Sequence, residues 1–112
     1  MNIEEYFKLS YKHFPRPQIV CRDGFTVSIQ GGKYYYSIPK KNGSNFEEYE
    51  LGFPEPSDSW LLEALNVPDS KEDVFGYVPL RIVNTLLERH GGIDEDKMLS
   101  ILTMMELTDE TS

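Results

Sequence analysis

The chain has 112 residues, of which 39% are hydrophobic and 12% aromatic, so it is long and apolar enough to bury a core and is not a disordered segment. Its 19 acidic and 11 basic residues give a net charge of −8, which disfavours free nucleic acid as a partner and favours basic protein surfaces. The charge is unevenly divided, with net +4 over residues 1–45 and net −12 over residues 46–112.

The cellular location is suggested by the cysteine count and the first residues. A single cysteine, Cys21, excludes an intramolecular disulfide and gives no sign of a secreted scaffold. Glu4 and Glu5 stand where a signal peptide needs basic residues, and no apolar run approaches the roughly 18 residues of a membrane span. We therefore expect a cytoplasmic protein with no membrane partner.

The first half of the chain predicts a helix followed by strands. Apolar residues at helical spacing, with Asn2 as a cap, predict a helix over residues 2–13 that ends before Pro15. Period-two patterns then predict four strands near residues 19–21, 25–29, 34–38 and 49–53, joined by glycine-containing turns. The residues expected on the core face of this sheet are Phe25, Val27, Ile29, Tyr34, Tyr36 and Ile38.

The second half predicts helices. A helix of about two turns starts near Trp60, an acidic loop covers residues 69–73, and a fifth short strand is expected over residues 74–78. A helix follows Pro79 and ends at Gly91, and another, capped by Asp94, runs to about residue 107. Residues 108–112 are expected to fray. The order predicts one α+β domain over residues 1–112, an antiparallel meander of four to five strands with an N-terminal helix and C-terminal helices packed on one face.

No motif in the sequence indicates catalysis. His90 precedes Asp94, Glu95 and Asp96, but a cation near the end of one helix and anions at the start of the next are favoured by the helix dipoles alone. Cys21 in a strand is most simply a small buried apolar residue. The paired glycines lack the other residues of phosphate-binding loops. We therefore predict no enzyme activity, no catalytic residue, no cofactor and no metal site.

Three segments carry a resemblance. Residues 50–54 (ELGFP), residues 76–79 (GYVP) and the helix end at residues 90–93 (HGGI) resemble parts of small uncharacterised proteins encoded by bacteriophages and mobile elements. The resemblance covers about residues 1–93 and implies no known active site. It implies a setting in which short acidic proteins often bind and block a host protein.

These observations favour a small acidic protein-binding module, plausible as a phage or mobile-element inhibitor or accessory protein that acts on a host protein. Imitation of nucleic-acid charge by its carboxylates is one mode of action. Methionines and aromatic residues adapt well to interfaces, and acidic residues suit a basic partner. The methionines of the last helix could contact this partner, or they could instead form the contact between two copies of the chain in a homodimer. The residues predicted to bind the partner are Tyr35, Glu47, Glu48, Glu50, Asp94, Glu95, Asp96 and Met104.

The alternative function is binding of single-stranded nucleic acid. Tyrosines on a sheet beside basic residues are typical of proteins that stack single-stranded bases, although tyrosine is also simply a good strand former. The residues expected to make these contacts are Lys33, Tyr35, Lys40 and Lys41 in the basic N-terminal half. The net charge of the whole chain opposes this alternative.

Overall fold

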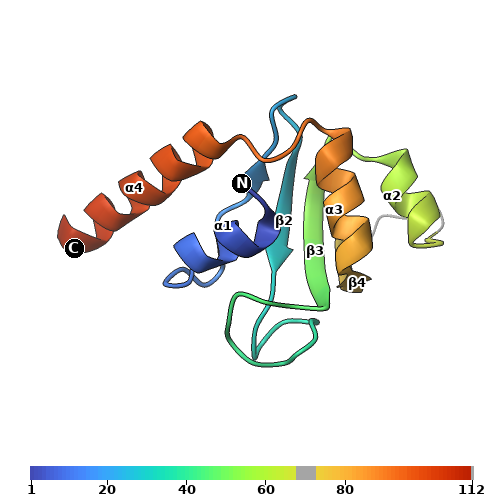
Figure 1. Ribbon diagram of the computed structural model, residues 1–112, viewed down its shortest axis with the longest axis horizontal. Coiled ribbons are helices and arrows are strands. Elements are labelled where there is room, and N and C mark those ends of the chain that lie inside the picture. The colour runs from blue at the N-terminus through green and yellow to red at the C-terminus, as the bar shows by residue number, and fades with distance from the viewer. Residues whose placement is uncertain (68–72, 112) are drawn as a thin grey trace.

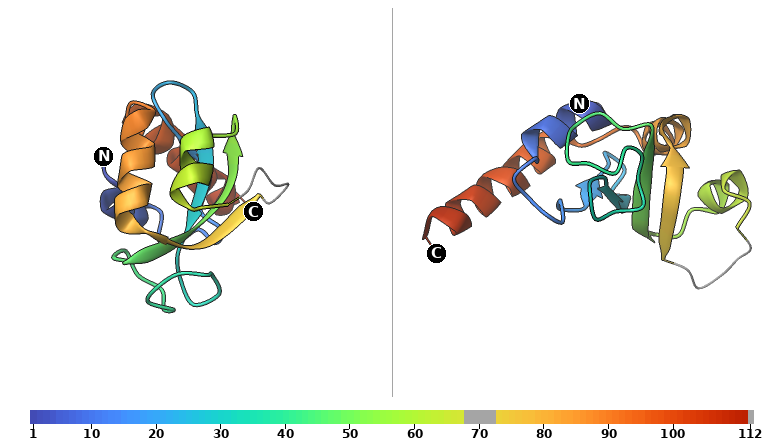
Figure 2. Two further views of the ribbon diagram at one scale, coloured as in Figure 1. Left: turned by 90° about the vertical axis from the view of Figure 1, so that its right-hand side faces the viewer. Right: turned by 90° about the horizontal axis from the view of Figure 1, so that it is seen from below.

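The computed structural model, which describes residues 1–67 and 73–111, is an α+β fold. One antiparallel sheet has the strand order β1-β2-β3-β4 and contains Ile19–Val20, Thr26–Gln30, Glu48–Glu55 and Val74–Pro79. Helices α1 (Ile3–Leu9) and α3 (Leu80–Arg89) lie over one face of the sheet (Figure 1). Helix α2 (Ser59–Ala64) lies beside α3, and α4 (Glu95–Thr111) runs away from the sheet (Figure 2). The predicted fold class is confirmed.

Local sequence signals account for the helix starts. The Asn2 side chain accepts a hydrogen bond from the Glu5 N–H, and the Glu5 carboxylate accepts one from the Asn2 N–H. Asp58 caps α2 through the Leu61 N–H at 2.9 Å, and Asp94 caps α4 through the Lys97 N–H at 3.1 Å. Helix α1 is shorter than predicted, because the buried Ser10 ends it and its hydroxyl accepts a hydrogen bond from a buried arginine.

The predicted strand at residues 34–38 is wrong. Residues 31–47 form an irregular loop, in which Ile38 makes only an isolated bridge with Glu48, and β2 pairs directly with β3. Tyr34, Tyr36 and Ile38 are exposed rather than in the core, whereas Phe25, Val27 and Ile29 are buried as expected. The alternation of residues 34–38 resembles that of a strand, but Pro39 interrupts it and other parts of the chain bind the loop backbone.

Both edges of the sheet are occupied by other segments. At the β1 edge, the Asp94 N–H donates to the Val20 carbonyl at 2.9 Å. At the β4 edge, the Tyr77 N–H donates to the Tyr36 carbonyl at 2.9 Å. Because unpaired strand edges invite pairing with other chains, these contacts limit strand addition as a way to bind a partner.

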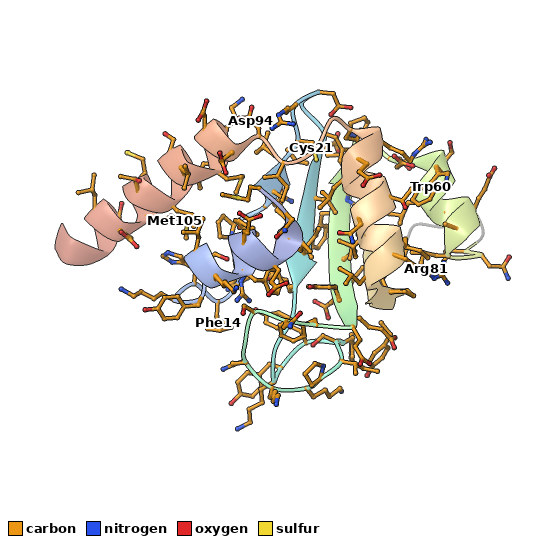
Figure 3. The ribbon with its side chains drawn as sticks, in the orientation of Figure 1. Phe14, Cys21, Trp60, Arg81, Asp94 and Met105 are labelled. Carbon is orange, nitrogen blue, oxygen red and sulfur yellow. The ribbon has the colours of Figure 1, made fainter. Side chains whose placement is uncertain are left out.

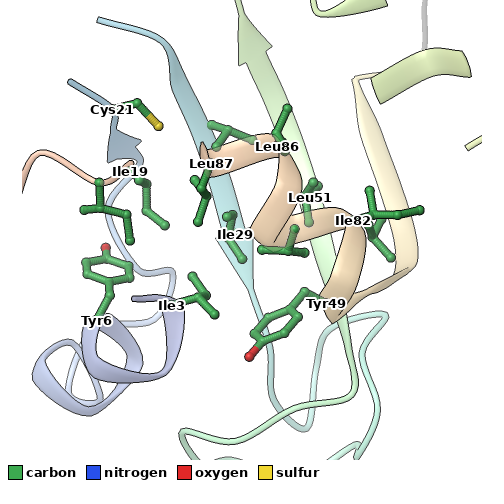
Figure 4. Packing of buried hydrophobic residues seen from close by; sticks show 14 of the residues in the cluster. Ile3, Tyr6, Ile19, Cys21, Ile29, Tyr49, Leu51, Ile82, Leu86 and Leu87 are labelled. Atoms are coloured by element: carbon green, nitrogen blue, oxygen red, sulfur yellow. The ribbon is translucent and has the colours of Figure 1, made fainter. Parts of the chain in front are cut away.

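The core lies between the sheet and helices α1 and α3 (Figure 4). Phe7 makes edge-to-face contacts with Phe46 and Tyr49, at centroid distances of 5.6 and 5.2 Å. Cys21 and Met98 extend the cluster toward the start of α4. This core fixes α1, α3 and the first two turns of α4 against the sheet.

Helix α4 extends through Thr111, and Ser112 lies outside the described residues. The expected fraying of residues 108–112 stays a prediction. The acidic loop at residues 69–73 also falls, except for Asp73, outside them. In the part of the chain that the structure describes, no helix is both long enough and apolar enough to cross a bilayer.

Candidate functional site

The outer half of α4 exposes apolar side chains. Met98 and Leu102 are buried, but Leu99 is 41% exposed and Met104 is 62% exposed. No residue from 98 to 105 is charged. Since an exposed helix of a soluble domain normally carries charged residues on its outer face, this segment is apolar on more sides than its own core requires. An open depression of about 420 Å³ runs along it, lined by Ser100, Ile101, Met104, Met105 and Thr108.

Acidic residues lie at both ends of this uncharged segment. Asp96 and Glu106 are exposed, and Lys97 is the one basic residue between Gly91 and the C-terminus. Asp94 is half-buried and caps the helix, while Glu95 lies 3.7 Å from the N-terminal ammonium. Of the predicted partner-binding residues on α4, Asp96 and Met104 are therefore exposed, and Asp94 has a structural role as the helix cap.

The other predicted partner-binding residues lie elsewhere. Glu47, Glu48 and Glu50 lie at the start of β3, whereas α4 begins at the opposite end of the sheet (Figure 1). The Glu50 carboxylate accepts a hydrogen bond from the Tyr36 N–H at 3.3 Å. Tyr35 is half-buried beside them, and burial together with Glu50 raises the pKa of its hydroxyl. The acidic residues of β3 and α4 thus do not form one surface.

A second surface consists of two loops, residues 10–18 and 31–47, which we call the loop end. Arg16 holds them together: its guanidinium donates to the carbonyls of Gly31 and Gly43, both at 3.3 Å, and to the carbonyl of Phe7 at 3.2 Å. The same group lies 3.8 Å from the centre of the Phe7 ring. Burial lowers the pKa of Arg16. A buried guanidinium thus fixes a loop whose sequence looked like a strand.

The loop end exposes tyrosine rings with lysines beside them. Tyr34 is 84% exposed, and the Lys33 ammonium lies 5.6 Å from its ring centre. Tyr36 and Tyr77 lie 5.9 Å apart, and the Lys40 ammonium lies 5.6 and 5.7 Å from their centres. Lys33, Lys40 and Lys41 are all exposed. The structure therefore brings together the predicted lysines, but with Tyr34, Tyr36 and Tyr77 in place of the less accessible Tyr35.

A third cluster surrounds His90. Its Nδ1 lies 2.7 Å from Asp23 Oδ2 and its Nε2 lies 2.6 Å from Asp58 Oδ2. Ionised carboxylates are acceptors, so this arrangement favours the imidazolium form, in which both ring nitrogens donate. The ring also stacks on Phe25 at 3.8 Å. Burial lowers the pKa of His90, but the hydrogen bonds to Asp58 and Asp23 outweigh it and the net shift is upward.

This cluster joins three parts of the chain. Asp23 lies between β1 and β2, Asp58 caps α2, and His90 caps the end of α3. The carboxylates lie on opposite sides of the ring, so they do not converge on one point where an ion could bind. The sequence offered Asp94, Glu95 and Asp96 as neighbours of His90, and no spacing signal points to Asp23 or Asp58.

The remaining candidates for chemistry are Cys21 and groups of side chains that could bind a metal. Cys21 is buried in the core, and burial raises the pKa of its thiol to about 12, so it is not a nucleophile near neutral pH. Among residues 1–67 and 73–111, no group of three histidine, cysteine or acidic side chains is arranged to hold a metal ion. No protein family, curated protein or solved structure matches the chain.

Proposed function

We propose that the protein is a small non-enzymatic binding module whose helix α4 docks on another protein. The observation that carries the proposal is the open depression along the uncharged segment 98–105, lined by Ile101, Met104 and Met105 on a helix directed away from the sheet (Figure 2). Large exposed apolar side chains on a soluble domain mark interaction surfaces. Methionine suits such a surface because its flexible side chain adapts to the shape of a partner.

Charge defines the chemistry of the partner. Asp96 and Glu106 lie on either side of the uncharged segment, and the chain from Gly91 onward carries six acidic residues and one lysine. The complementary surface is an apolar patch with lysine or arginine residues at its rim. A second copy of this chain would bring acidic residues near acidic residues, so charge favours a different, basic protein as the partner.

The wider role proposed here is that of an inhibitor or accessory protein of a phage or mobile element, acting in the cytoplasm on a host protein. It rests on the acidic charge and on the sequence resemblance. A host protein that handles nucleic acid has the required basic surface, and the carboxylates of α4 could occupy it as phosphates do.

The test compares two variants that introduce the same charge. Met104→Glu places a carboxylate in the depression, whereas Thr103→Glu places it one residue earlier, about 100° around the helix and outside the residues that line the depression. Wild type and both variants are immobilised and exposed to a nuclease-treated bacterial lysate, and retained proteins are identified by mass spectrometry. We expect one basic protein to be retained by wild type and by Thr103→Glu and to be lost with Met104→Glu.

The retained protein is then purified and its affinity measured by titration calorimetry over a range of salt concentrations. The proposal predicts a Kd at least tenfold higher for Met104→Glu, since a charge buried in an interface without a partner costs several kcal/mol, and weaker binding as salt rises. Equal binding by the two variants would contradict docking through α4. Retention of nothing except the protein itself would instead indicate a homodimer.

A further inference from the structure

The loop end separates positive charge from the acidic remainder of the molecule. Its residues, 10–18 and 31–47, contain five lysine or arginine residues and one acidic residue, Glu47 at the boundary with β3, in a chain whose net charge is −8. Arg16 is buried and joins the two loops, while the lysines point outward from them. Because salt screens charges beyond about 8 Å at physiological ionic strength, a ligand at this end experiences mainly the local lysines.

Aromatic rings stand among these lysines. Tyr34 and Tyr36 are 84% and 56% exposed, and Phe14, also at this end, is 49% exposed (Figure 3). Lys33 and Lys40 each lie less than 6 Å from the centre of a tyrosine ring. Exposed rings next to cations combine the two contacts that single-stranded nucleic acid offers, a stacking face on each base and a negative phosphate between bases.

The backbone under one of these tyrosines is constrained. Tyr77 has a φ of +56°, which is unfavourable for a residue with a side chain, and it lies where the β3–β4 register shifts. Its N–H donates to the Tyr36 carbonyl, and Tyr36 Cβ passes so close to Gly76 that a Cβ there would lie 2.8 Å away. A bulge therefore directs Tyr77 outward and holds Tyr36 beside it, so the two rings are positioned before any ligand arrives.

We propose that the loop end is a binding site for single-stranded nucleic acid. Bases stack on Tyr34 and on the Tyr36–Tyr77 pair, and Lys33, Lys40 and Lys41 contact phosphates. The site lies on different elements from the exposed surface of α4, so the inference goes beyond the proposed function and does not depend on it. Three carboxylates oppose it: Glu47 at the end of the loop, Glu48, which pairs with Ile38, and Glu50, which accepts a hydrogen bond from the Tyr36 N–H.

The experiment measures binding of fluorescein-labelled oligothymidylate and oligouridylate, each about 15 nucleotides long, by fluorescence anisotropy at about 50 mM salt and above. Replacement of Lys33 and Lys40 by alanine is expected to raise Kd about tenfold and to lower the slope of log Kd against log salt by about 1.4. Tyr34→Ala is expected to raise Kd between about 5-fold and 100-fold, the range for loss of one stacked base.

Three controls make the result specific. The first is the double replacement of Arg89 and Lys97 by alanine, which changes the net charge by as much as the replacement of Lys33 and Lys40 does. Because these two residues lie on α3 and α4, we expect Kd to stay within about twofold of the wild-type value. Glu50→Gln keeps an acceptor for the Tyr36 N–H while removing the charge, so it should bind more tightly than wild type. Met104→Glu should bind as wild type does, which separates this site from α4.

The preference of the protein for single strands over a duplex decides whether the loop end is such a site. Tighter binding of either single strand than of a duplex of the same length, with the expected losses in the lysine and Tyr34 variants, supports the site. No binding at about 50 mM salt overturns it, as does an equal loss in the two double variants. Thermal unfolding followed by circular dichroism confirms that each variant is folded; Tyr34 is a suitable target because its side chain is almost fully exposed.

Discussion

At the scale of single residues, His90 makes stability depend on pH. The pKa of His90 is higher in the folded protein than in the unfolded chain. The histidine therefore contributes fully to the free energy of unfolding below its unfolded pKa of about 6.5, and this contribution is lost as the pH rises through the folded pKa. The backbone N–H of Phe25 and the His90 ring lower the pKa of Asp23, and His90 and the Leu61 N–H lower that of Asp58 despite its burial. These two carboxylates therefore contribute to the free energy of unfolding above about pH 3.9, and the contribution is lost as the pH falls through their folded pKa values.

We therefore expect the contacts between these three residues to stabilise the protein most between about pH 4 and pH 6.5. His90→Gln should lower the melting temperature by about 5 °C near pH 6 and by clearly less at pH 9. The measurement is thermal unfolding of wild type and variant across this range, and their difference removes the effect of overall charge. A difference that stays constant with pH would contradict the assignment of an imidazolium.

Arg16 is the second residue with a large expected effect. Its acceptors are three backbone carbonyls and the Ser10 hydroxyl, and its guanidinium is stacked on Phe7. Arg16→Lys retains the charge but not the planar set of donors, so buried carbonyls lose their partners. We expect a loss of about 2–4 kcal/mol in the free energy of unfolding, measured by urea denaturation. Lys12→Ala, at an exposed position in the same loop, should change it by less than about 0.5 kcal/mol.

At the scale of elements, the bulge in β4 positions the loop that precedes β3. Gly76→Ala would place a Cβ 2.8 Å from Tyr36 Cβ, so the strand or the loop must move. The expected cost is about 1–3 kcal/mol, measured by the same denaturation experiment. Gly43→Ala is the matched control, because a Cβ there meets no atom within 4 Å, and it should be neutral or slightly stabilising. An equal cost for both would mean that the Tyr36 contact does not fix the loop.

Helix α4 has one face that stabilises the fold and one that does not. Leu102 is 6% exposed and packs in the core, so Leu102→Ala should cost about 2–4 kcal/mol. Met104 is 62% exposed, and Met104→Ala should change the free energy of unfolding by less than about 0.5 kcal/mol. Comparable losses from the two variants in urea denaturation would show that Met104 is buried within this chain.

The sequence was most informative where local signals act alone. Caps and apolar spacing located the helices, and the capping role of Asp94 follows from its position before α4. The strand predicted at residues 34–38 failed because alternation does not reveal a buried arginine that binds the loop backbone from another part of the chain. The partners of His90 were missed for the same reason, since they lie 67 and 32 residues away along the chain.

The candidate surfaces were predicted only in part. Met104 and the lysines of the loop end could be named from the sequence by residue type, and the structure shows that they are exposed. Which tyrosine is accessible depends on the path of the loop, and that path is set by Arg16 and by the β4 bulge. The acidic residues of β3 and α4 looked like one group in sequence, but the fold separates them to different ends of the sheet (Figure 1).

At the scale of the whole molecule, α4 lengthens the protein in one direction. The molecule measures 44 × 31 × 24 Å, and α4 runs obliquely outward, so its end lies at one extreme of the longest axis (Figure 1). The compact part contains the core, the His90 contacts and the loop end. The compact part therefore carries most of the packing, and the proposed function gives partner binding to a helix that packs in the core only at its start.

Sedimentation velocity of the purified protein tests the central claim, that a different, basic protein covers the exposed surface of α4. The account predicts a monomer of 13.0 kDa at both low and high salt, because the acidic residues around this surface oppose self-association. A dimer that strengthens as salt screens the acidic charges, and that Met104→Glu dissociates while Thr103→Glu does not, would contradict it and assign α4 to contact between two copies of the chain.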